Sequence, residues 1–188
     1  MVTEKRADAQ RNRARLVEAA REAFTTSGDK VTLESVARAA GVGIGTLYRH
    51  FPTRETLVEA VFRAEQDRLC DSAGKLLADL APEEALRAWM DRFADYVATK
   101  RDMADTLRAV IASGAVTSSQ SRERLSGAVR TLLEAGAAAG TLRADVVAED
   151  VVASIVGVFL ACGGPDQREQ AGRMLDLIMA GLRGVPER

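Results

Sequence analysis

A short stretch of the chain combines small, hydroxyl and basic side chains in a spacing suited to contact with a polyanion. Gly45, Thr46, Arg49 and His50 fall on one side of an α-helix. Small residues at the start of a helix let its backbone approach phosphate closely, and a helix N-terminus itself attracts an anion. The basic side chains can reach phosphates or base edges, and the threonine can contact a thymine methyl group or a phosphate. These residues therefore predict a surface that binds nucleic acid.

Two short helices joined by a tight turn would present this surface. Thr32 is a good N-cap for the first, which stops at Gly41, a residue that adopts positive φ without strain. Pro52 ends the second, because the residue before a proline is displaced from the α region. The connection Gly41-Val42-Gly43 has the length that a helix-turn-helix needs. The apolar positions are Leu33, Val36, Ala37 and Ala40 on the first helix, and Ile44, Leu47, Tyr48 and Phe51 on one face of the second.

Several of these side chains have two interpretations at this point. Tyr48 packs between helices or points its hydroxyl at phosphate, and Arg49 binds DNA or is solvated. His50 is the single histidine, and the chain has no HExxH motif or Cys/His cluster, so a metal-binding or catalytic role is disfavoured. The basic run of Arg11, Arg13 and Arg15 is either an arm that touches DNA or the solvated face of the first helix, and the solvated face is slightly favoured.

The segment TLESVARAAGVGIGTLYRHFPTRE, residues 32–55, resembles the DNA-binding signature of the TetR family of transcriptional regulators. The likeness covers roughly residues 10–60. It implies that Thr32 contacts phosphate and that Arg54, where the family usually has lysine, binds backbone phosphate. Gly43 stands where the family often has serine, so a hydroxyl that would cap the second helix is missing. The expected DNA-contacting residues are Thr32, Ile44, Gly45, Thr46, Tyr48, Arg49, His50 and Arg54.

The rest of the chain repeats the 3.6-residue apolar period of amphipathic helices, with no strand-like alternation. We expect an all-α fold of about nine helices: a three-helix headpiece followed by a helical body. One helix, capped by Thr53, starts at Arg54 and runs to about Leu80, and Pro82 starts the next. Residues 113–121 are expected to be a loop, and a later helix ends near Gly140. The segment Val151–Leu160 is expected to be buried on several sides, with Gly163-Gly164-Pro165 breaking that helix.

The composition is that of a globular protein that can form a core without disulfides or a structural metal: 47% of residues are hydrophobic and the net charge is −1. Residues 1–63 hold 11 Lys and Arg against 8 Asp and Glu, and the remainder is acidic, a distribution that suits a protein with one end facing a polyanion. Cys70 and Cys162 fit no metal-binding or redox spacing and suggest free thiols in a reducing compartment. We expect a cytoplasmic protein with no cofactor, metal or membrane partner and no enzymatic activity.

The resemblance implies a DNA-binding domain, residues 1–55, and a ligand-binding and dimerisation domain, residues 56–188. The last two helices are expected to form a homodimer through a four-helix interface, since Val151, Val152, Ile155, Val156, Phe159, Met174, Leu175, Ile178 and Leu182 exceed what one small body buries. A stripe of aromatic and methionine residues either lines an effector pocket or is plain core: Trp89, Met90, Phe93, Tyr96, Met103, Leu107 and Phe159.

The favoured function is a repressor that a small-molecule effector releases from a palindromic operator in double-stranded DNA. The same parts suit an activator, or a repressor that needs its effector to bind DNA. Two other classes are weaker. An all-α enzyme lacks a nucleophile–base pair, a metal cluster or a glycine-rich phosphate loop in the sequence, and a helical adaptor would have to have lost DNA binding.

Overall fold

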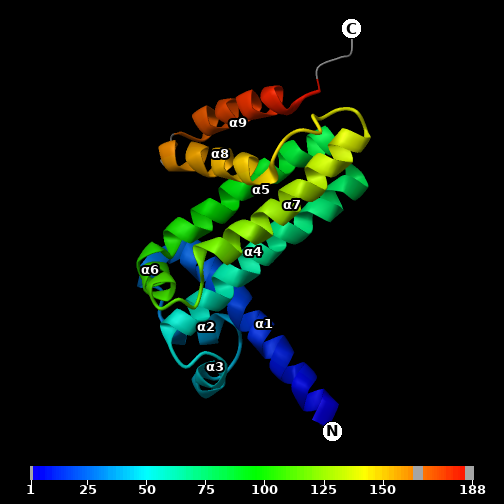
Figure 1. The fold of residues 1–188 in the computed structure, drawn as a ribbon. Helices are drawn as coiled ribbons and strands as arrows, with labels where there is room; N and C mark the ends of the chain where they lie inside the picture. The colour runs from blue at the N-terminus through cyan, green and yellow to red at the C-terminus, as the bar shows by residue number, and fades with distance from the viewer. Residues whose placement is uncertain (1, 163–166, 185–188) are drawn as a thin grey trace. The chain divides into compact units, whose positions relative to one another are not determined.

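The computed structural model describes residues 2–162 and 167–184, which form nine α-helices and no β-sheet (Figure 1). The predicted all-α fold is confirmed. An isolated bridge pairs Leu142 with Arg183. The elements are α1 (Val2–Ser27), the 3-10 turn η1 (Gly28–Lys30), α2 (Leu33–Ala39), α3 (Ile44–His50), α4 (Arg54–Asp79), α5 (Pro82–Asp102), α6 (Ala104–Ala112), α7 (Ser118–Ala138), α8 (Ala148–Ala161) and α9 (Arg168–Leu182).

The chain divides into two compact units. The first, which we call the headpiece unit, comprises Met1–Glu65 and Ala98–Thr117. The second, the body unit, comprises Gln66–Val97 and Ser118–Arg188. The helices α4 and α5 therefore each contribute one part to each unit. The division predicted between residues 55 and 56 stays a prediction.

Side-chain and backbone caps set the ends of the headpiece helices. The Thr32 hydroxyl accepts a hydrogen bond of 3.1 Å from the Ser35 amide, as an N-cap does. Gly41 has a φ of 64°, and the Val42 amide donates to the Ala37 carbonyl over 3.0 Å. Together with the bond from the Gly41 amide to the Arg38 carbonyl, this is a Schellman motif, which satisfies the last carbonyls of α2. The sequence therefore closes α2 locally at both ends.

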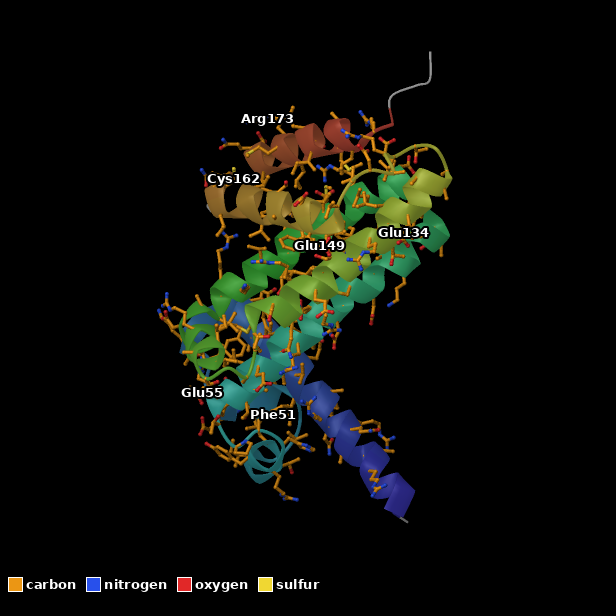
Figure 2. All side chains as sticks on the ribbon, in the orientation of Figure 1. Phe51, Glu55, Glu134, Glu149, Cys162 and Arg173 are labelled. Atoms are coloured by element: carbon orange, nitrogen blue, oxygen red, sulfur yellow. The ribbon has the colours of Figure 1, made fainter. Side chains whose placement is uncertain are left out.

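The headpiece core is apolar and draws on each of its first four helices. Figure 2 labels Phe51, which follows α3 and is 1% exposed. The apolar side of α3 is only partly buried, because Ile44 and Tyr48 are 39% and 45% exposed whereas Leu47 is fully buried. A seven-residue helix contacting neighbours on one side buries only a narrow stripe. The core residues are Leu16, Ala20, Phe24, Val36, Ala37, Leu47, Phe51, Leu57, Val58 and Val61.

Two predicted features of the body unit need correction. The expected loop 113–121 is shorter, since α7 begins at Ser118. The helix α8 is not buried on several sides, because Val156 is 36% and Leu160 is 80% exposed within the chain. The helices α8 and α9 lie side by side (Figure 1), and both bury one face only. The predicted break at Gly163-Gly164-Pro165 lies outside the described residues. Among the described residues, no helix has the length and apolarity that crossing a membrane requires.

Candidate nucleic-acid interface

The outward side of α3 is exposed and begins with small residues. Gly43, the N-cap of α3, and Gly45 have no atom within 4 Å of the position that a Cβ would occupy. No side chain caps the helix start, as expected from the glycine at position 43. Leu47 is fully buried on the opposite side, which fixes the rotation of the helix. The arrangement leaves the first turn of α3 accessible to another backbone, such as that of DNA.

The structure places the predicted contact residues of α3 around this opening. Gly45 and Arg49 are exposed, Thr46 is partly exposed, and Tyr48 is turned outward. The Arg49 Nε donates to the Gly45 carbonyl over 3.1 Å, which directs that side chain along the helix surface. His50 is half-buried, with its ring centroid 6.3 Å from that of Phe51. The two interpretations of Tyr48 are thereby reduced to the exposed one.

Arginines from α1 and α2 surround the same region. The Arg13 guanidinium lies over the Phe51 ring at 5.1 Å, a cation–π contact, and the Arg15 guanidinium approaches Gly41 in the turn. Arg38 is exposed on α2. None of these three, nor Arg49, forms an ion pair with a carboxylate of the described residues. Arg11, by contrast, pairs with Asp8. The sequence did not show that Arg13 and Arg15 reach the helix-turn-helix.

Arginines of the body unit are mostly neutralised by neighbours. Arg130 pairs with Glu149 at 2.7 Å, and Arg87 contacts both Asp91 and Asp176. Arg143 and Arg183 are likewise paired, with Asp145 and Glu83. Four arginines without a carboxylate partner among the described residues therefore lie on or beside α2 and α3, although Arg92, Arg122 and Arg173 of the body unit also form no ion pair there. Such charge favours a polyanion, and its contribution to binding falls with salt.

Arg54 differs from the other predicted DNA contacts because protein groups engage its guanidinium. Its Nε donates to the Thr106 hydroxyl over 3.1 Å, and a second nitrogen donates to the Val31 carbonyl. The guanidinium carbon also lies 5.1 Å from the centroid of the Phe24 ring. These contacts could not be predicted from the sequence, since Thr106 is 52 residues away and lies in a different helix.

The predicted pocket residues do not form one cluster within a unit. Trp89, Met90, Phe93 and Tyr96 on α5 and Phe159 on α8 belong to the body unit, whereas Met103 and Leu107 belong to the headpiece unit. Phe93 is the centre of the aromatic group. Its ring centroid lies 5.8 Å from Trp89, 5.6 Å from Tyr96 and 5.7 Å from Phe159. Offset and edge contacts of this kind stabilise aromatic cores.

The interior of the body unit contains polar groups that were not predicted from the sequence. The Trp89 indole donates to the Leu69 carbonyl over 2.9 Å, and the Gln66 amide donates to the Ser121 carbonyl over 3.1 Å. The Ser126 hydroxyl is fully buried and has no partner among the described residues. Gln66 and Ser126 both occupy apolar stripes, three residues before Leu69 and Val129, a spacing that could have identified them.

The titratable side chains in this interior favour their neutral forms. Burial raises the pKa of Cys70 to about 11, despite the nearby Arg124, and burial raises the pKa of the Tyr96 phenol above its ordinary range. Both cysteines are free thiols. Within the described residues, no group of three or more His, Cys, Asp and Glu side chains is arranged to hold a metal ion.

Comparison with known proteins finds similarity over most of the chain. Residues 16–61 match the family described as "Bacterial regulatory proteins, tetR family", and residues 81–184 match "Transcriptional regulator SbtR-like, C-terminal domain". A TetR transcriptional regulator from Streptomyces coelicolor is 50% identical, with 92% of this chain and 99% of that one covered and a TM-score of 0.82. A TetR regulatory protein from Mycobacterium vanbaalenii is 34% identical, with 95% and 98% covered and a TM-score of 0.71.

A curated relative, the HTH-type transcriptional regulator UidR of Escherichia coli strain K12, is 32% identical over 69 residues. That match covers 36% of this chain and 35% of the relative, so the chain spans about a third of its length. The fold and the α2–α3 surface define a helix-turn-helix DNA-binding regulator of transcription. With both family matches and the full-length similarity, the chain belongs to the TetR family.

Proposed function

We propose that this protein is a cytoplasmic homodimeric repressor that binds a pseudo-palindromic operator and is released by a small-molecule effector. The observation that carries the DNA-binding part is the set of arginines without carboxylate partners, Arg13, Arg15, Arg38 and Arg49, around the open start of α3. An arginine already paired with a carboxylate must lose that partner to bind phosphate. These arginines have no such cost among the described residues.

In this proposal α3 lies in the major groove. Ile44, Gly45, Thr46, Tyr48 and His50 face base edges and the sugar–phosphate backbone, with Arg49 at the rim. Thr32 contacts phosphate at the start of α2, where its exposed position and its role as N-cap support that assignment. The role of Arg54 at phosphate stays a prediction, since its guanidinium donates to Thr106 and to the Val31 carbonyl in this structure.

Dimerisation through α8 and α9 is supported by their uncovered apolar side chains. Leu160 and Leu177 are 80% and 74% exposed, unusual values for leucines on adjacent helices. Most residues that the sequence assigned to the interface, such as Ile155 and Leu175, are instead buried within the chain. A two-fold dimer would present two α3 helices to successive turns of one DNA face.

Effector binding is assigned to the body unit. The aromatic group around Phe93 includes two polar atoms, the Trp89 indole N–H and the Tyr96 hydroxyl. An apolar group with a few polar atoms has the composition of a small-molecule site. An effector that binds one conformation of the dimer more tightly shifts the population away from the DNA-binding state.

The decisive experiment selects bound duplexes from a random pool and then measures their affinity over a series of KCl concentrations. The expected result is a two-fold symmetric site and a steep fall in affinity with salt. Arg49→Gln should reduce the magnitude of the slope of log K against log salt by about one, since one phosphate contact is lost. Arg130→Gln, which removes an arginine already paired with Glu149, is the matched control and should leave the slope unchanged. Selection of no duplex at low salt would reject the proposal.

A further inference from the structure

Two large apolar side chains of α3 are left uncovered on one face of that helix. Ile44 is 39% exposed and Tyr48 is 45% exposed. Residues four apart lie one above the other on a helix, so these two side chains are neighbours. Leu47, between them in the sequence, is fully buried and fixes the rotation of α3. The exposed pair is therefore a defined apolar strip on a helix that the core holds in place.

Ile44 lacks flanking side chains that could shield it. It lies between Gly43 and Gly45, and no atom is within 4 Å of the position that a Cβ would occupy at either glycine. An isoleucine in a helix is largely restricted to one χ1 rotamer, so its methyl groups project in one direction. The Tyr48 hydroxyl can bond to water or phosphate, whereas the Ile44 side chain has no polar atom. Exposed apolar surface of this kind is stabilised only when another apolar group covers it.

The charges near the strip indicate which partner covers it. Arg13, Arg15, Arg38 and Arg49 lie on or beside α2 and α3 and form no ion pair with a carboxylate of the described residues. A surface of this charge attracts a polyanion. Among the four bases of duplex DNA, thymine alone presents a methyl group in the major groove. An apolar side chain among unpaired arginines therefore has its complement at a thymine.

We propose that Ile44 is a specificity-determining residue that packs against the 5-methyl group of a thymine in each half-site of the operator. This inference rests on the proposed DNA-binding function and names a base that the site selects. An arginine or a hydroxyl can bind phosphate next to any base pair, so such contacts carry no sequence information by themselves. Ile44 offers no hydrogen bond and gains affinity only where a methyl group is present. The selected operator should hold a T·A pair at the same position of both half-sites.

The test replaces thymidine by deoxyuridine, one position at a time, in one half-site of the selected duplex. Uracil keeps the pairing edge and the O4 acceptor of thymine and lacks only the methyl group. At one position the wild type should bind the uracil duplex about fourfold more weakly, the effect of leaving one methyl-sized group unburied. Ile44→Ala should bind the two duplexes equally at that position. Both affinities come from one protein preparation, so any inactive fraction cancels from their ratio.

Thr46→Ala is the matched control, because it shortens a side chain on the same helix, two residues further along. It should keep the ratio of about fourfold between the thymine and uracil duplexes. Ile44→Val, which retains both branches at Cβ, should keep most of that ratio. In a third duplex, C·G replaces the T·A pair. Methylation of that cytosine at C5 should strengthen wild-type binding about fourfold and leave Ile44→Ala binding unchanged.

The possible results separate this inference from the proposed function. Equal wild-type affinity for the thymine and uracil duplexes at every position would overturn the inference and leave operator binding established. A ratio that persists in Ile44→Ala and disappears in Thr46→Ala would assign the methyl contact to the threonine, and the inference would be wrong. Selection of no duplex from the random pool would reject the proposed function and this inference with it.

Discussion

Arg15 reaches from α1 to the turn after α2, where its terminal nitrogen lies 2.8 Å from the position that a Cβ on Gly41 would take. Gly41 has a φ of 64°, the left-handed conformation that a side chain disfavours. The glycine therefore permits both the turn of the helix-turn-helix and the approach of an arginine from another helix. The lack of a side chain at position 41 therefore allows both the backbone conformation of the turn and the close packing of Arg15.

Gly41→Ala should lower the free energy of unfolding of the headpiece by about 1 kcal/mol, because a left-handed alanine is strained. Thermal unfolding followed by circular dichroism measures the change. Gly45→Ala is the matched control, since it adds the same methyl group inside α3 where no atom lies within 4 Å. It should keep or raise the melting temperature. Equal losses in both variants would contradict the importance of the turn conformation.

Thr46→Ala should change operator preference more than stability. Its side chain is partly exposed on the outward face of α3, and a lost base contact should alter the relative affinity for one base pair about tenfold. The free energy of unfolding should change by less than about 0.5 kcal/mol. Repeating the duplex selection with the variant measures preference, and thermal unfolding measures stability. A collapse of the melting temperature would show that the threonine is structural.

Leu177→Glu should convert the dimer to a monomer, because a carboxylate on the exposed face of α9 would be buried against the second copy. Sedimentation equilibrium gives the mass. Val147→Glu introduces the same charge at an apolar residue that is 53% exposed but precedes α8, and it should remain dimeric. A Leu177→Glu protein with the mass of the wild type would place the interface elsewhere.

Ser126→Ala should stabilise the protein by about 1 kcal/mol. The hydroxyl is fully buried without a partner in the described part of the chain, so its removal abolishes a desolvation cost and leaves only a small void. Urea unfolding gives the free energy difference. Ser72→Ala is the comparison, because that hydroxyl donates to the Leu69 carbonyl over 2.7 Å and its loss should destabilise. A destabilised Ser126→Ala variant would mean that the hydroxyl has a partner in solution.

Cys70 should resist alkylation in the folded protein as pH rises. Burial raises the pKa of its thiol from 9.0 to about 11, so the folded state holds a proton that the unfolded state releases between these values. The associated stability is complete below pH 9.0 and is lost as the pH approaches about 11. Iodoacetamide labelling with peptide mass spectrometry, compared with protein unfolded in urea, measures the thiolate. Equal labelling rates near the lower value would contradict the raised pKa.

The sequence by itself determined the features that depend on neighbours within a few residues. The caps at Thr32 and Gly41, the end of α4, the start of α5 and the all-α fold follow from hydroxyls, glycines, prolines and a 3.6-residue period that act locally. The two faces of α3 were harder to assign. Tyr48 and Ile44 satisfy the apolar pattern, but only the neighbouring helices decide how wide a stripe is covered.

Only the tertiary structure decided which charges are neutralised and which connections cross the chain. Two contacts join residues that are distant in the sequence: Arg15 lies beside Gly41, and Arg54 donates to both Val31 and Thr106. The tertiary structure also leaves leucines of α8 and α9 exposed. Side chains of the same type differ in these respects because electrostatic and packing energies depend on distance and burial, and the local pattern specifies neither.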